Sequence, residues 1–172
     1  MIGEREQLIL DEGLRLFPYR CTAGKITIGV GRNLEDNPLT AMEVIRLLSS
    51  RPHINVTNIP ISEVRRLLLE DFYAKGITRE EAYFLLDNDI KKFSLRLIDA
   101  LPWVNSAPVE VQRILLNMAF NMGISNLLTF ENTLKEIKQG NYKQAAENMK
   151  KSKWAKQVTN RAGRLIERMA KI

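Results

Sequence analysis

Apolar residues recur at helical spacing over most of the chain. The first such segment runs from about residue 4 to residue 12, where Leu8 and Glu12 lie one turn apart on the same face. Gly13 follows directly and can take the left-handed conformation that ends a helix. Glu12 is therefore expected at the carboxyl end of a helix.

A longer helix is predicted after Thr78, where the sequence Thr-Arg-Glu-Glu resembles a capping box. Its apolar positions continue at helical spacing to about Leu97. Further helices are predicted at residues 40–49, 61–74, 109–121, 131–139, 142–152 and 159–170.

One short segment has a period of two instead. Ile26, Ile28 and Val30 alternate with small or polar residues, which predicts a strand preceded by a hairpin. If the hairpin loop is centred on Gly24, Cys21 and Thr27 are cross-strand partners with Cβ atoms about 5 Å apart. Helices with one hairpin predict an α+β fold that is mostly α.

Composition limits the size of the core, the kind of partner and the redox compartment, but it does not identify a function. A chain of 172 residues can bury roughly 70% of its unfolded surface, enough for one core or two small lobes. The net charge of +6 suits a polyanionic partner such as a bacterial wall or a nucleic acid. The single cysteine excludes an intrachain disulfide, which fits a reducing cytoplasm.

Neither the N-terminal segment nor the longest uncharged stretch has the features of a targeting signal or a membrane span. The N-terminal residues MIGEREQLILDEG contain acids and no apolar core, so no secretory signal is expected. The uncharged stretch 114–130 contains several polar residues and is too short to span a bilayer comfortably.

Glu12, Cys21 and Thr27 are the candidate catalytic residues. Eight residues separate the first pair and five separate the second. The dipole at a helix carboxyl end disfavours a negative charge on Glu12, which favours an acid catalyst. Taken singly, the three residues also fit a solvated surface acid, a small buried thiol and a structural strand threonine.

Several separated motifs strengthen the catalytic interpretation. The chain contains, in this order, DEGLRL, TIGVG, NMAFNMG, AAENMKKSKW and NRA. In this it resembles the phage-type lysozymes, the family of the T-even phage lysozyme, over most of its length. In that family a Glu, an Asp or Cys, and a Thr at this spacing form the catalytic triad, which implies the same role for Glu12, Cys21 and Thr27.

The resemblance also implies an architecture. It implies a single lysozyme-like domain over residues 1–172 with two lobes. A small lobe with the β-hairpin is expected at 14–77, a connecting helix at 78–99, and a helical lobe at 100–172 together with 1–13.

Further site residues follow from the resemblance alone. It implies saccharide binding or a place in the cleft for Asn33, Phe120, Asn121, Thr133 and Asn148. It also implies that Trp154 is a buried aromatic residue and that Arg161 lies beside the catalytic acid. For Phe120 and Trp154, a role in the core is the favoured alternative, and one side chain can serve both purposes.

Cys21 stands where the T-even enzyme has Asp, and this leaves two mechanisms open. Cys21 can act as the base for a water held by Thr27, which gives inversion, or as a nucleophile, which gives retention. A free thiol has a pKa of about 8.5, so its activation depends on its neighbours. Lys25 and Arg20 are close in sequence, although Arg20 is expected on the opposite face of the strand.

The predicted function is that of a muramidase that cleaves the β-1,4 bond between N-acetylmuramic acid and N-acetylglucosamine. The alternatives are a lytic transglycosylase and a lysozyme-like protein that binds glycan without cutting it. We expect a monomer that needs no cofactor and whose partner is peptidoglycan, not nucleic acid. We also expect synthesis in the host cytoplasm and action on the wall after release.

Two segments have no assigned role in this scheme. Residues 38–75 are predicted to be a helical insertion that either covers its neighbours or grips glycan or a partner. They contain His53, the only histidine, which is not expected to bind a metal without a second ligand nearby. The helix at 159–170 is basic and amphipathic, which suits simple packing, contact with acidic wall polymers, or an anionic membrane.

Overall fold

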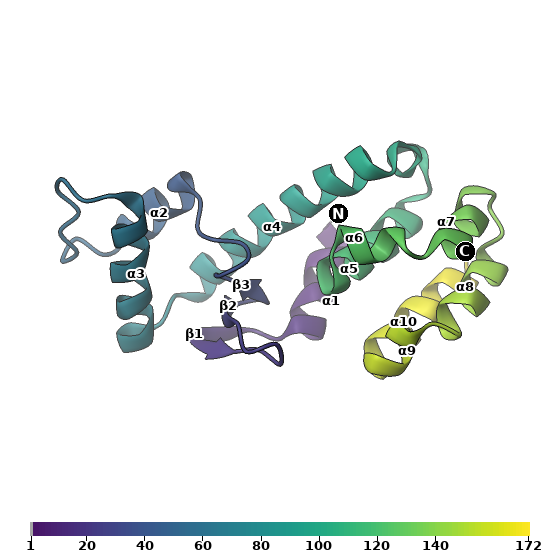
Figure 1. Cartoon of the computed structure of the whole chain (residues 1–172), viewed down its shortest axis with the longest axis horizontal. Helices are drawn as coiled ribbons and strands as arrows, with labels where there is room; N and C mark the ends of the chain where they lie inside the picture. Colours follow the sequence, from purple (N-terminus) through teal and green to yellow (C-terminus); the bar gives the residue numbers. More distant parts are fainter. Residues whose placement is uncertain (1) are drawn as a thin grey trace. The chain divides into compact units, whose positions relative to one another are not determined.

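The computed structural model describes residues 2–172, with side chains from residue 4 onward. It is mostly helical with one three-stranded antiparallel sheet in the order β1-β2-β3 (Figure 1). The predicted α+β, mostly α class is therefore confirmed. The chain forms two compact units, which comprise residues 5–89 and residues 2–4 with 90–172. The lobe boundaries implied by the resemblance stay predictions.

The elements of the first unit are α1 (Ile2–Glu12), β1 (Arg15–Arg20), β2 (Ile26–Gly29), β3 (Arg32–Asn33), α2 (Ala41–Leu48), α3 (Ile61–Lys75) and the start of α4 (Arg79–Ala100). The second unit continues with η1 (Pro102–Ser106), α5 (Val109–Met122), α6 (Ile124–Leu128), α7 (Glu131–Lys138), α8 (Tyr142–Lys150), α9 (Lys153–Gln157) and α10 (Thr159–Ala170). The short elements η1, α6 and α9 were not predicted as helices.

Helix α1 ends as the sequence predicts. Gly13 has a φ of +76°, and its N–H donates to the carbonyl of Ile9 at 2.9 Å. This left-handed residue directs the chain out of the helix and into β1. Glu12 is therefore the last residue of α1.

The hairpin between β1 and β2 has a different register from the predicted one. Tyr19, not Cys21, lies opposite Thr27. The N–H of Cys21 donates to the carbonyl of Lys25 at 3.0 Å, so these two residues close the loop. Gly24 takes its φ of +76° at the last position of a three-residue loop, as is common in such hairpins. The predicted pairing of Cys21 with Thr27 was wrong because the glycine ends the loop and does not centre it.

The two helices predicted within residues 38–75 are present, and they complete the core of the first unit. Figure 1 shows α2 and α3 side by side, and they are in contact. Buried side chains from both helices pack with others from the sheet and α4. This core consists of Ile28, Leu39, Val44, Leu47, Val64, Leu68, Phe72, Ile77, Ala82 and Leu85.

An ion-pair network holds the loop between α2 and α3. Arg51 contacts Asp71 of α3 and Glu81 of α4, each at 2.7 Å. His53 joins the same network through a contact of 2.7 Å between its Nε2 and Asp71. The segment thus covers its neighbours, and a role in gripping glycan or a partner stays a prediction.

The second unit is built around α5, whose side chains are mostly buried. Gly123, with a φ of +82°, ends α5 after Met122. Helix α10 packs on α8 and α5. No helix among the described residues is both long enough and apolar enough to cross a bilayer.

The basic helix α10 turns its apolar side into the protein. Ala162, Leu165 and Met169 are all buried, as expected of a packed terminal helix. Arg161 is buried as well, whereas Arg164 is exposed. The apolar face is therefore occupied in the folded protein. Contact of the exposed basic residues with acidic wall polymers or an anionic membrane stays a prediction.

Candidate active site

Glu12 rests against a glycine in the turn between β2 and β3. A Cβ atom on Gly31 would lie only 2.9 Å from Oε2 of Glu12. Gly31 also has a φ of +68°, a backbone conformation that residues other than glycine rarely adopt. Both the close approach and the backbone conformation therefore require glycine at the second Gly of the TIGVG motif.

The sulfur of Cys21 accepts several hydrogen bonds within its own turn. The donors are the backbone N–H groups of Lys25 and Ala23 and the hydroxyl of Thr27. The hydrogen bond from Lys25 is the largest cause of a lowered thiol pKa, and those from Ala23 and Thr27 act in the same direction. These hydrogen bonds stabilise the thiolate relative to that of a free cysteine.

Neighbouring cations are not what lowers the pKa of Cys21. The ammonium group of Lys25 pairs instead with Glu35 and Asp36 at 3.6 and 3.3 Å. The guanidinium of Arg20 donates to the carbonyl of Gly24 at 2.7 Å. The hydrogen bonds to the sulfur explain the shift without these charges.

The same geometry explains why Cys or Asp suits this position. The Cys21 side chain accepts from an N–H two residues onward and from another four residues onward. Aspartate commonly makes the first of these contacts when it begins a turn. Either side chain can therefore present an anion at this point without a change of backbone.

Thr27 lies in the central strand, opposite Tyr19 on one side and Asn33 on the other. Its side chain is diagonal to Cys21 on the same face of the hairpin, so the two meet despite the shifted register. Thr27 is only 3% exposed, and its hydroxyl lies 3.1 Å from the carbonyl of Lys25. Because the hydroxyl proton has acceptors in Lys25 and Cys21, its oxygen remains able to accept from a water molecule.

Glu12, Cys21 and Thr27 all belong to the first unit. Burial is the main cause of the raised pKa of Tyr19, which lies on the same face as Cys21, and charges on Glu12 and Cys21 act in the same direction. The acid and the thiol are therefore near one tyrosine side chain. Tyr19 was missed from the sequence, although its position two residues before Cys21 on a strand was the available signal.

The side chain of Asn33 forms hydrogen bonds within its own loop. Its Oδ1 accepts from the N–H groups of Glu35 and Asp36 at 3.0 and 2.9 Å. Its amide nitrogen donates to the carboxylate of Asp36 at 2.9 Å. A part for Asn33 in saccharide binding stays a prediction.

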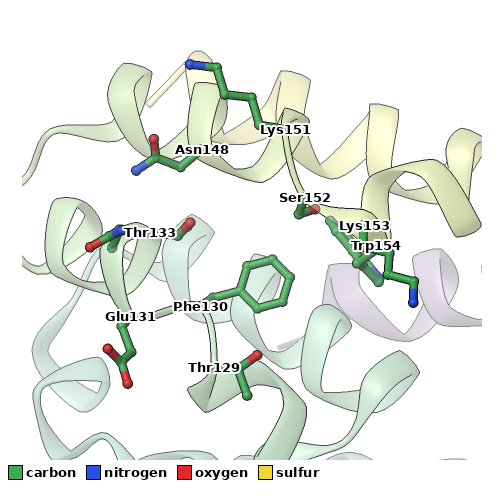
Figure 2. Close-up of a pocket in the computed structure, with 10 residues that line it drawn as sticks. Thr129, Phe130, Glu131, Thr133, Asn148, Lys151, Ser152, Lys153 and Trp154 are labelled. Carbon is green, nitrogen blue, oxygen red and sulfur yellow. The ribbon is translucent and has the colours of Figure 1, made fainter.

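In the second unit, Thr133 and Asn148 line one pocket of about 440 Å³. Figure 2 shows Phe130 in the same pocket with its ring directed toward Trp154, and the two rings meet edge to face at 6.1 Å. The indole N–H of Trp154 donates to Asn121 at 2.8 Å. The structure thus brings together four of the residues implied by the resemblance.

Phe120 and Arg161 have contacts within the same unit. The ring of Phe120 packs at 5.2 Å from that of Phe93. Arg161 is buried, and its Nε donates to Oδ1 of Asn117 at 2.8 Å. Asn117 in turn donates to the buried carboxylate of Glu4 at 2.6 Å. The proximity of Arg161 to the catalytic acid stays a prediction.

Comparisons with known proteins identify the family of the chain. Residues 10–171 match the model of the phage lysozyme family. Probable T4-type lysozyme 1 of Dictyostelium discoideum is 27% identical over 94% of this chain and 90% of its own length. Probable T4-type lysozyme 2 of the same organism is 28% identical over the same shares.

A third relative is a larger phage protein. The pre-baseplate central spike protein Gp5 of Enterobacteria phage T4 is 31% identical over 93% of this chain, which spans 26% of Gp5. The match to the family model covers nearly the whole sequence, including Cys21 and Thr27. The chain therefore belongs to the phage lysozyme family, and this membership supports a peptidoglycan hydrolase with glycosidase activity.

Proposed function

We propose that this protein is a muramidase that hydrolyses the β-1,4 bond between N-acetylmuramic acid and N-acetylglucosamine. The observation that carries the proposal is the hydrogen-bonded sulfur of Cys21 beside Thr27, in the same unit as Glu12. Glycoside hydrolysis needs a proton donor and a second group that activates water or attacks the sugar. Glu12 and Cys21 supply these two groups.

Glu12 acts as the general acid. It gives its proton to the glycosidic oxygen as the bond from that oxygen to the sugar C1 breaks. Glu12 is the last residue of α1, so the chain turns away directly after it. The absence of a side chain at Gly31 leaves the space that the carboxyl group of Glu12 occupies.

Cys21 acts as the general base. Its thiolate takes a proton from water while the water oxygen bonds to C1 of the sugar. Thr27 accepts a hydrogen bond from the same water, since its own proton is engaged by Lys25 or Cys21. Attack by water from the side opposite the leaving oxygen gives inversion at C1.

The pocket of the second unit binds part of the glycan in this proposal. The hydroxyl of Thr133 and the amide of Asn148 offer hydrogen bonds to a polar ligand. The rings of Phe130 and Trp154 add apolar surface on which a sugar ring can pack. Lys151 and Lys153 line this pocket together with Glu131, so the charged side chains of the lining carry a net positive charge.

Substitutions at Cys21 test the proposal. Cys21→Ala is expected to slow the clearing of purified bacterial walls about 100-fold, because the base is lost. Cys21→Asp is expected to retain most of the activity, because a carboxylate can accept the same N–H groups. The rates are measured by the loss of turbidity. Unimpaired clearing by Cys21→Ala would remove the base assignment.

A further inference from the structure

Tyr19 lies on the catalytic face of the hairpin without a role in the mechanism above. It is directly opposite Thr27 in the sheet. It also shares a strand face with Cys21, because residues two apart on a strand point the same way. The phenol ring is thus next to both members of the pair that handles water.

The surroundings of Tyr19 keep its hydroxyl protonated. Burial is the main cause of its raised pKa, and the negative charges of Glu12 and Cys21 act in the same direction. Arg15 opposes them with its guanidinium 4.5 Å from the ring centroid. Because the net pKa is raised, the hydroxyl is a hydrogen-bond donor throughout the neutral range.

This donor has no protein acceptor in the part of the chain that the structure describes. Glu12 and Cys21 act on it through their charges and not through a hydrogen bond, and the hydroxyl of Thr27 is engaged with Lys25. A half-buried hydroxyl without a partner loses free energy unless water or a ligand accepts its hydrogen bond. The cation over the ring meanwhile limits its freedom to turn away.

We propose that the Tyr19 hydroxyl donates a hydrogen bond to an oxygen of the sugar bound beside Glu12 and Cys21. This inference rests on the proposed function. An N-acetylated sugar offers hydroxyl and acetamido oxygens as acceptors, and either can take the hydrogen bond that this hydroxyl otherwise gives to solvent. Tyr19 is then a substrate-binding residue, and its hydroxyl takes no part in proton transfer.

Kinetics of Tyr19→Phe on soluble peptidoglycan fragments test this role. One neutral hydrogen bond is worth about 1 kcal/mol, so KM is expected to rise roughly 5-fold. The value of kcat and the pH profile are expected to stay unchanged, because the acid and the base are intact. A merely structural role would lower kcat and thermal stability together.

Tyr83→Phe is the matched control. Tyr83 is also half-buried in the first unit, with the guanidinium of Arg5 at 4.6 Å from its ring centroid. Removal of the Tyr83 hydroxyl is expected to leave KM unchanged. An unchanged KM in Tyr19→Phe, or a fall in kcat with a lower melting temperature, would overturn the inference.

Cys21→Ala is measured in the same series to separate the two proposals. If Cys21→Ala is inactive while Tyr19→Phe has a normal KM, only the role of Tyr19 fails. If Cys21→Ala is fully active, the base assignment fails, whatever the result for Tyr19.

Discussion

Replacement of Glu12 by Gln is expected to slow wall lysis about 1000-fold. A positioned general acid contributes roughly 100- to 10,000-fold to a reaction that must protonate a poor leaving group. Glutamine keeps the size of the side chain next to Gly31, but its amide is not acidic and cannot protonate the leaving oxygen. The fold should therefore persist while the chemistry is lost.

The control for this variant lies on the same helix. Glu6 is an exposed residue of α1, so Glu6→Gln removes one charge at a distance from the hairpin. Its lysis rate is expected to equal that of the parent chain. If Glu12→Gln clears walls as fast as Glu6→Gln does, Glu12 is not the acid.

Replacement of Arg32 by Ala is expected to lower the free energy of unfolding by about 3–5 kcal/mol. Arg32 is only 2% exposed and pairs with two carboxylates that are also buried, Glu43 at 2.7 Å and Asp89 at 2.9 Å. Without the guanidinium, two negative charges remain in the interior. Urea unfolding at neutral pH measures the loss.

A surface ion pair provides the contrast. Arg66 pairs with Glu63 on the exposed side of α3, where solvent screens the charges. Arg66→Ala is expected to change the free energy of unfolding little. Similar effects from Arg66→Ala and Arg32→Ala would show that the buried cluster does not stabilise the fold.

The acid dependence of the same cluster follows from Glu43. Burial raises its pKa, but hydrogen bonds from Arg32, Thr40 and Asn88 outweigh burial and lower the pKa overall. A carboxyl with a lowered pKa in the folded state stabilises the fold above its unfolded pKa of about 4.3. That stabilisation is lost as the pH falls through the folded value. The difference in the free energy of unfolding between Arg32→Ala and the parent chain should therefore become smaller in acid.

The buried cluster also positions the candidate site. Arg32 lies opposite Ile28 in the sheet, so it holds the strand next to Thr27. It ties that strand to α2 through Glu43 and to α4 through Asp89. The sequence gives no sign of this arrangement, because its three members are far apart in the chain and no local pattern joins them.

Local patterns did predict the longer helices. The capping-box sequence at Thr78 has its expected hydrogen bonds. The N–H of Glu81 donates to the Thr78 hydroxyl at 3.1 Å, and the N–H of Thr78 donates to the Glu81 carboxylate at 2.9 Å. Helices of five residues, such as α6 and α9, are too short to show a period. The hairpin register failed for a different reason, because Gly24 can take positive φ at more than one loop position.

The sequence indicated the candidate residues but not the contacts around them. Spacing and resemblance together indicated Glu12, Cys21 and Thr27, and these lie in one unit. The hydrogen bonds that lower the thiol pKa depend on the turn geometry, which the sequence does not show. The charges of Arg20 and Lys25, which are visible in the sequence, are not the cause of the lowered pKa. Tyr19 needed the actual register to be recognised.

Digestion of purified peptidoglycan in water enriched in heavy oxygen tests the central claim most directly. Hydrolysis by a water activated at Cys21 predicts that each new N-acetylmuramic acid reducing end carries one heavy oxygen, as measured by mass spectrometry. Unlabelled anhydro-muramic ends would show lytic transglycosylation, and bound but uncut glycan would show a binding protein. Either result would contradict the proposed hydrolysis.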